Sequence, residues 1–205
     1  MSKSIFTKQE LSSLAALALI ALLAFASGLD GWLAETASGR SSLGISLFFS
    51  FWYFLGFEAI GFVALWRLDR KTFASAAVSL VLLAIFRSVI ASLFFRPRPP
   101  QAMPIGDDLL ALIFLFQAKS SFFSGHAAAA ISIWTAMMQS RIRPKLGFIA
   151  ALPILSSRLT LVHHYLSDVL AGAMFGYVLT KVVMCLLASP VVDRKSSQWR
   201  ALKPG

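Results

Sequence analysis

The sequence predicts an all-α membrane protein, a polytopic bundle of about six transmembrane helices that forms one domain over residues 1–205. Hydrophobic residues make up 58% of the chain and the mean hydropathy is +0.75, both well above the values of ordinary soluble domains. The apolar residues form long runs separated by short basic clusters, and several runs are long enough to cross a bilayer. These three observations indicate an integral membrane protein.

The net charge of +10 is distributed as membrane topology requires. The basic residues lie in short clusters between apolar runs, so we predict membrane lipids and no nucleic acid as partners. Cys185 is the only cysteine and lies within a late apolar run. The chain therefore forms no intramolecular disulfide and builds no cysteine-based metal site.

The first half of the chain contains three candidate spans, which are Leu11–Gly28, Leu43–Trp66 and Phe73–Phe95. The first span follows Lys3 and Lys8 and contains an Ala-Phe-Ala sequence that imitates a signal-peptidase site. Its length favours an uncleaved first span.

The second half contains three more candidate spans, which are Ser124–Arg141, Leu146–His163 and Asp168–Ala188. The earlier run Leu109–Phe116 is too short to span and is expected at the membrane interface. Gly172 and Gly176 form a GxxxG pair, which we interpret as helix packing inside the bundle instead of a dimer face.

Two charges fall inside the early spans, Glu58 in the second and Arg87 in the third. Charged residues in membrane helices usually face the bundle interior. We expect a structural ion pair between Glu58 and Arg87. The alternative hypothesis is that Arg87 contributes to an anion site.

Loop charges predict the orientation. Twelve basic residues lie in connections on the side of the two termini, against five on the opposite side. By the positive-inside rule both termini are cytoplasmic, and the segments near residues 98, 126 and 164 lie on the extracytoplasmic side. The expected location is the bacterial inner (cytoplasmic) membrane.

The segment 157–168 places Arg158, His164 and Asp168 inside an otherwise apolar stretch, where ionisable groups are usually functional. If the segment is helical, the spacing of four puts His164 and Asp168 on one face. The carboxylate then accepts a hydrogen bond from one ring nitrogen and leaves the other free to attack. His163 points elsewhere under that geometry. The alternative is a His-Asp pair that merely caps a helix end.

Residues far apart in the sequence should meet at one membrane depth. His126 lies ~22 Å and Arg158 ~20 Å from the cytoplasmic ends of their spans, at ~1.5 Å per residue. Both depths fall below the outer surface of a ~30 Å hydrocarbon core. Arg98, in the loop after the third span, should lie above the site, on the outer side of the depth shared by His126 and Arg158.

These residues suit phosphoryl transfer. The guanidinium groups of Arg98 and Arg158 are planar and charged, and their N–H donors match the geometry of phosphate oxygens. Ser124 and Gly125 open a helix whose N-terminal amides form an anion site. His164 is the expected nucleophile, with Asp168 holding its tautomer and His126 acting as general acid. The scheme requires no metal and no cofactor.

The same residues resemble the three motifs of the type 2 phosphatidic acid phosphatase family. The third motif, Ser-Arg-five residues-His-three residues-Asp, is matched fully by Ser157, Arg158, His164 and Asp168. The second, Pro-Ser-Gly-His, is matched by Ser124, Gly125 and His126, with Phe123 in place of proline. The end of the first, Lys-six residues-Arg-Pro, is matched by Arg98 and Pro99.

The resemblance implies a six-helix bundle that hydrolyses a lipid phosphate through a phosphohistidine intermediate. Family members of this size act on prenyl diphosphates, phosphatidylglycerol phosphate, phosphatidic acid or lipid A phosphates. Two alternatives stay open: a lipid phosphotransferase, and a non-catalytic lipid-phosphate-binding membrane protein. A vanadate-dependent haloperoxidase shares the anion site but is soluble, so the six expected spans argue against that class.

One departure from the pattern concerns the lysine of the first motif. Its position is Ala91, or Val89 if the register starts from Arg96 and Pro97. Arg87 lies one helical turn before Ala91 and is the tentative replacement for the missing phosphate contact.

The charge pattern generates a topology prediction. A reporter fused after Arg141 should be cytoplasmic, and one inserted near Gly106 should be extracytoplasmic, because the basic clusters alternate along the chain. Enzymatic labelling of the two fusions in whole cells checks the assignment, and reversed labelling contradicts it.

Overall fold

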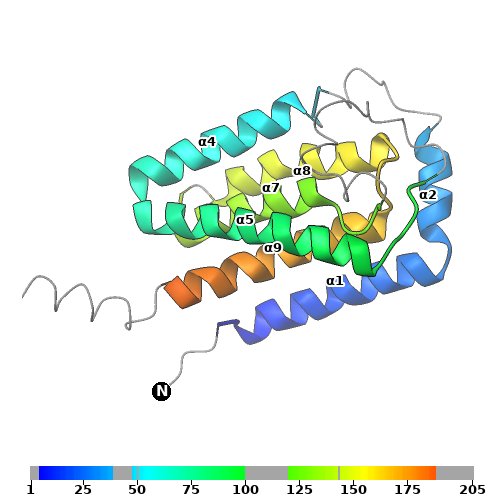
Figure 1. The fold of residues 1–205 in the computed structure, drawn as a ribbon, viewed down its shortest axis with the longest axis horizontal. Helices are drawn as coiled ribbons and strands as arrows, with labels where there is room; N and C mark the ends of the chain where they lie inside the picture. The colour runs from blue at the N-terminus through cyan, green and yellow to red at the C-terminus, as the bar shows by residue number, and fades with distance from the viewer. Residues whose placement is uncertain (1–4, 39–47, 50, 100–119, 143, 188–205) are drawn as a thin grey trace, which may run out of the picture.

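The computed structural model describes residues 5–38, 48–49, 51–99, 120–142 and 144–187, and the elements named in these residues are all helices (Figure 1). Seven helices are named in the described part of the chain: α1 Lys8–Ala26, α2 Leu29–Ser38, α4 Trp52–Leu68, α5 Arg70–Leu93, α7 Gly125–Gln139, α8 Pro144–Thr160 and α9 Leu166–Leu187. The all-helical prediction is confirmed. The expected run Leu109–Phe116 lies outside the described residues.

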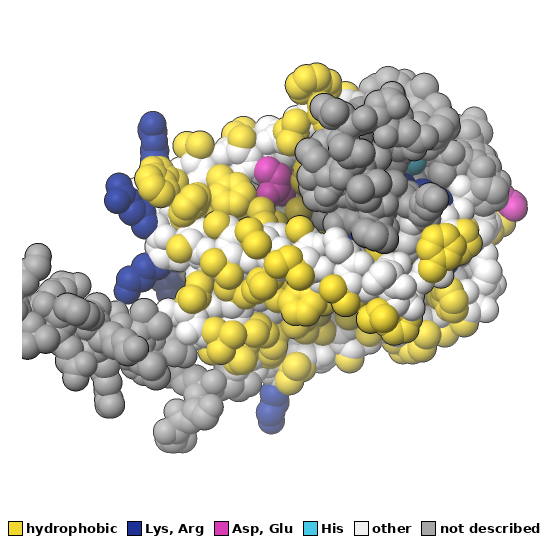
Figure 2. All heavy atoms as spheres, viewed as in Figure 1, with side chains coloured by type: hydrophobic (Ala, Val, Ile, Leu, Met, Phe, Trp, Pro, Cys, Tyr) yellow, Lys and Arg dark blue, Asp and Glu magenta, His cyan; other side chains and the backbone are white. Residues whose placement is uncertain are grey.

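The helices α1, α4, α5, α7, α8 and α9 run roughly side by side along one axis, whereas α2 crosses one end of the bundle (Figure 1). By length and composition, α1, α5 and α9 are long and apolar enough to cross a membrane. The helices α4, α7 and α8 have 17, 15 and 17 residues. Large apolar side chains are exposed along α1, α4, α5 and α8, and Figure 2 shows hydrophobic side chains spread over one face. This surface is the kind that hydrocarbon covers.

Two helix boundaries differ from the expected spans. The first helix ends before Gly28, whose φ of 76° turns the chain into the unexpected helix α2. The fifth span was expected to reach His163, but α8 ends at Thr160 and α9 begins at Leu166. His163 and His164 therefore lie in a short connection.

The turn between α4 and α5 is fixed by Asp69. Its carboxylate accepts hydrogen bonds from the Thr72 amide at 3.1 Å and the Thr72 hydroxyl at 2.6 Å, and so caps α5. It also accepts from the Ser140 hydroxyl at 2.8 Å, which joins the turn to the end of α7. The Thr72 hydrogen bonds hold the pKa of Asp69 below its usual value.

The helix α7 is the centre of the bundle and packs most extensively against α9. Small residues allow the two backbones to approach closely. A Cβ added at Gly172 would collide with the carbonyl oxygen of Ser124, and one at Gly176 with that of Ala128. The structure thus confirms that the GxxxG pair packs inside the bundle.

Gly176→Ala should destabilise the protein by about 1–3 kcal/mol, because its new Cβ overpacks a rigid backbone contact. Gly56→Ala is the matched control, since a Cβ at Gly56 meets no atom within 4 Å. There the better helix propensity of alanine should leave stability unchanged or raised by up to about 1 kcal/mol. Thermal unfolding in detergent measures both, and equal melting temperatures would contradict the packing role.

Candidate active site

The beginnings of α7 and α9 meet and bring two of the predicted motifs together. The Ser124 amide donates to the Asp168 carbonyl oxygen at 3.0 Å. The Ser124 side chain caps α7 by accepting from the Ala127 amide at 3.5 Å. The N-terminus of α7, with Gly125 and His126 in its first turn, therefore lies beside the Asp168 segment.

A buried ionic network surrounds Asp168. Arg96 donates from Nη1 to Asp168 at 2.7 Å and from Nη2 to Asp30 at 3.0 Å. The Asp30 and Asp168 side chains are 4% and 0% exposed, so both carboxylates need this partner. Arg96 thus belongs to the site as the partner of two carboxylates, a role that was not predicted from the sequence.

Asp30 was not anticipated as part of the site. It accepts from the Ser167 amide at 3.1 Å and from the Ser167 hydroxyl, so that a side chain of α2 satisfies an unpaired amide in the first turn of α9. Its only sequence signal was a carboxylate two residues beyond the glycine that ends the first apolar run.

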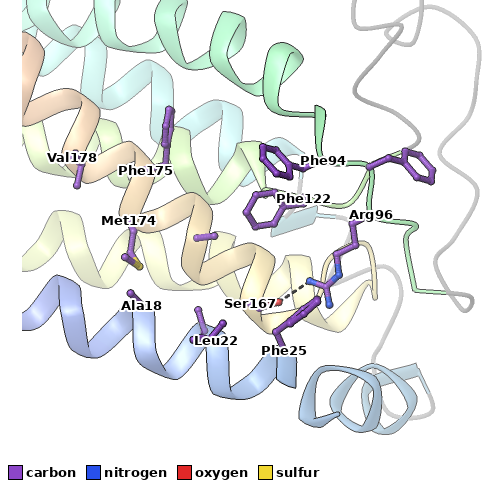
Figure 3. Close-up of a pocket in the computed structure, with 13 residues that line it drawn as sticks. Ala18, Leu22, Phe25, Phe94, Arg96, Phe122, Ser167, Met174, Phe175 and Val178 are labelled. Carbon is purple, nitrogen blue, oxygen red and sulfur yellow. Dashed lines mark hydrogen bonds between the residues drawn. The ribbon is translucent and has the colours of Figure 1, made fainter. Parts of the chain in front are cut away.

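The Arg96 side chain also lies at one end of an apolar pocket of about 750 Å³ between α1 and α9 (Figure 3). The guanidinium carbon is 3.9 Å from the centroid of the Tyr165 ring and 5.0 Å from that of Phe25. Apart from Arg96 and Ser167, the pocket is lined by apolar side chains of α1 and α9, by Phe94 and Phe95 after α5, and by Phe122 before α7.

His164 has a different partner from the expected one. Its Nδ1 lies 2.7 Å from the Ser121 carbonyl oxygen, whereas Asp168 accepts from Arg96 and from the Tyr165 amide at 3.0 Å. The expectation assumed that His164 and Asp168 share one helix, but His164 precedes α9. Because a carbonyl only accepts, Nδ1 carries the proton and Nε2 keeps the lone pair.

The electrostatic setting keeps His164 neutral. Burial is the main cause, and the positive charges of Arg158, Arg98 and Arg87 add to it, so that the pKa of His164 lies well below its usual value. The Ser121 carbonyl raises the pKa but does not outweigh these effects. A neutral imidazole with a lone pair on Nε2 is the form that attacks an electrophile.

His163 does not point away from the other site residues, as the helical geometry had predicted. Its Nδ1 lies 3.1 Å from Nη2 of Arg158, and its carbonyl oxygen accepts from Nη1 of Arg98 at 3.4 Å. His163 also lies close enough to His126 to interact with it electrostatically. The reason is again the connection between α8 and α9, where Val162 has a φ of 55°.

Arg87 lies against the opening of α7 and not against Glu58. Its Nε donates to the Phe123 carbonyl at 3.0 Å, and a Cβ on Gly125 would be 3.1 Å from that nitrogen. Oε1 of Glu58 is buried without a hydrogen-bond partner in the described part of the chain. The expected Glu58–Arg87 ion pair is therefore wrong, and Arg87 is brought to the cluster of Arg98, Arg158 and His126.

The position of the missing motif lysine, Ala91, is 4% exposed and packed in the bundle. No three His, Cys, Asp or Glu side chains among the described residues are placed to hold a metal ion. The guanidinium groups and the amides at the start of α7 are groups of the kind that suit an anion.

Comparison with known proteins shows the family of the chain and a similar fold. The family model of the PAP2 superfamily matches residues 72–189, so the chain belongs to the PAP2 superfamily. Within the family, a crystal structure of a transmembrane PAP2-type phosphatidylglycerolphosphate phosphatase from Bacillus subtilis has a similar fold. The TM-score is 0.60 at 17% identity, over 85% of this chain and 94% of that one. No curated protein sequence matches this chain.

The ionic network predicts a stability effect at Asp30. Asp30→Ala leaves the Ser167 amide and Nη2 of Arg96 without their acceptor, and a buried donor left unsatisfied costs about 1–3 kcal/mol. Glu35→Ala is the control, because Glu35 is an exposed carboxylate of the same helix. Melting temperatures in detergent should fall for Asp30→Ala only, and a normal value for that variant would show that the network contributes little.

Proposed function

We propose that the protein is a membrane-embedded phosphatase that hydrolyses a phosphomonoester or diphosphate of a lipid through a phosphohistidine intermediate. The observation that carries the proposal is the 2.7 Å contact between Nδ1 of His164 and the Ser121 carbonyl oxygen. Because the carbonyl only accepts, this contact places the ring proton on Nδ1 and leaves the Nε2 lone pair available, and three guanidinium groups act electrostatically on the ring. Membership of the PAP2 superfamily supports the same reaction class.

In the first step, Nε2 of His164 attacks the phosphorus atom and forms a P–N bond. The P–O bond to the lipid breaks, and His126 donates a proton to the leaving oxygen. In the second step, His126 accepts a proton from a water molecule whose oxygen attacks the phosphorus, and the P–N bond breaks. Phosphate leaves and His164 regains its lone pair.

Arg98, Arg158 and Arg87 would bind the phosphoryl oxygens, together with the amides at the start of α7. Their charge stabilises the transition state without a metal ion, which makes metal independence part of the proposal. Asp168 takes a positioning role through Arg96 and the Tyr165 amide.

The lipid nature of the substrate is supported by the setting of the site. The site lies among apolar helices, and the apolar pocket beside Arg96 offers space for a hydrocarbon chain. Prenyl diphosphates, phosphatidylglycerol phosphate, phosphatidic acid and lipid A phosphates are the candidate substrates. The proposed location is the bacterial inner membrane, and the distribution of basic residues supports a site that faces its extracytoplasmic side.

The test is release of inorganic phosphate from these four lipid phosphates by the purified protein in detergent. We expect release from at least one of them, unaffected by EDTA and inhibited by orthovanadate, which imitates pentacoordinate phosphorus. His164→Ala should abolish turnover, because it removes the nucleophile, whereas His126→Ala should lower it by about 10²–10⁴-fold. Acid-labile phosphate should be trapped on the wild-type protein.

Near-normal turnover by His164→Ala would disprove the mechanism. Loss of activity in EDTA with recovery in magnesium would disprove metal independence. Transfer of the phosphoryl group to a second lipid, with no free phosphate released, would favour the phosphotransferase alternative.

A further inference from the structure

His163 is a buried polar side chain whose second ring nitrogen has no role in the scheme above. The residue is 6% exposed, and Nε2 has no hydrogen-bond partner within the described residues. The other nitrogen, Nδ1, lies 3.1 Å from Nη2 of Arg158. The family pattern asks for no particular residue at this position.

The contact with Arg158 determines where the proton of the ring lies. A guanidinium group only donates hydrogen bonds, so Nδ1 must accept and cannot carry the proton. Burial, and then the charges of Arg158 and Arg98, lower the pKa of His163 to about 3, so the ring is neutral. The single ring proton is therefore on Nε2, and this donor has no acceptor among the described residues.

An unused buried donor is costly. A buried N–H group without an acceptor loses its hydration and gains nothing in return, so such groups in native structures usually indicate a missing partner. The surroundings of His163 specify the charge of that partner. Arg98 donates to its carbonyl oxygen, Arg158 contacts its ring, and His126 is near, so an acceptor bound here would be an anion.

We propose that Nε2–H of His163 donates a hydrogen bond to a phosphoryl oxygen of the substrate. The proposal rests on the proposed function and adds a phosphate-binding residue to it. His163 would then supply the donor that is lacking at Ala91, where the family pattern has lysine. Unlike lysine, it does so as a neutral group, which adds no further charge to a cluster that already contains three arginines.

Two variants separate the two nitrogen atoms of the ring. His163→Asn keeps a polar group near the place of Nδ1, and so keeps an acceptor for Arg158, but removes the distal donor. His163→Gln keeps an N–H near the place of Nε2 and gives up the acceptor for Arg158. A residue that only supports Arg158 would tolerate asparagine, whereas a phosphate donor would tolerate glutamine.

We expect kcat/KM for a lipid phosphate to fall about ten- to hundredfold in His163→Asn, the range for a hydrogen bond to a charged group. The inhibition constant of orthovanadate should rise by a similar factor. In His163→Gln both quantities should stay within a few-fold of the wild-type values. Melting temperatures in detergent confirm that each variant is folded.

Three outcomes would overturn the inference: His163→Asn active with His163→Gln impaired, both variants active, or both impaired equally. If the wild-type protein hydrolyses none of the lipid phosphates, the proposed function fails. The inference is then tested by binding alone, since orthovanadate should raise the melting temperature of wild type and His163→Gln more than that of His163→Asn.

Discussion

The close approach of the α7 and α9 backbones is the constraint on which the site depends. Gly172 and Gly176 allow α9 to lie directly against the carbonyl groups of Ser124 and Ala128. This proximity lets the Ser124 amide reach the Asp168 carbonyl, so that the beginnings of both helices meet. Any side chain at the two glycines would separate the helix that carries His126 from the one that carries Asp168.

Around this contact the protein balances charge in two different ways. At Arg96 two buried carboxylates share one guanidinium group, which holds α2, α9 and the segment after α5 in one arrangement. Elsewhere in the site, the positive charges of Arg87, Arg98 and Arg158 act together on His164. On the first side the charges are paired in a closed ionic network that orders the site. On the second side the arginines leave an excess of positive charge, which suits an anionic substrate.

The sequence was sufficient for features with a periodic or compositional signature. Long apolar runs located the helices, and the spacing of Gly172 and Gly176 indicated their packing role. The sequence was insufficient where the backbone departs from regular helix. The helical spacing of His164 and Asp168 implied a hydrogen bond between them, but α8 ends at Thr160, and a carbonyl takes that place. A carbonyl acceptor has no signature in the sequence, and neither does the turn that brings His163 to Arg158.

The ionic network also has a consequence for biogenesis. Asp30 belongs to α2, whereas Arg96 follows 66 residues later and Ser167 137 residues later. During synthesis the carboxylate must stay in contact with water, since its partners are not yet made. Asp30 and Asp168 share Arg96 only once α9 has been made and packed in place, so the ionic network and the site are completed together. A chain interrupted before α9 already contains Asp30 and Arg96 but lacks Asp168 and Ser167, so its network stays incomplete and one guanidinium group is left with a single carboxylate.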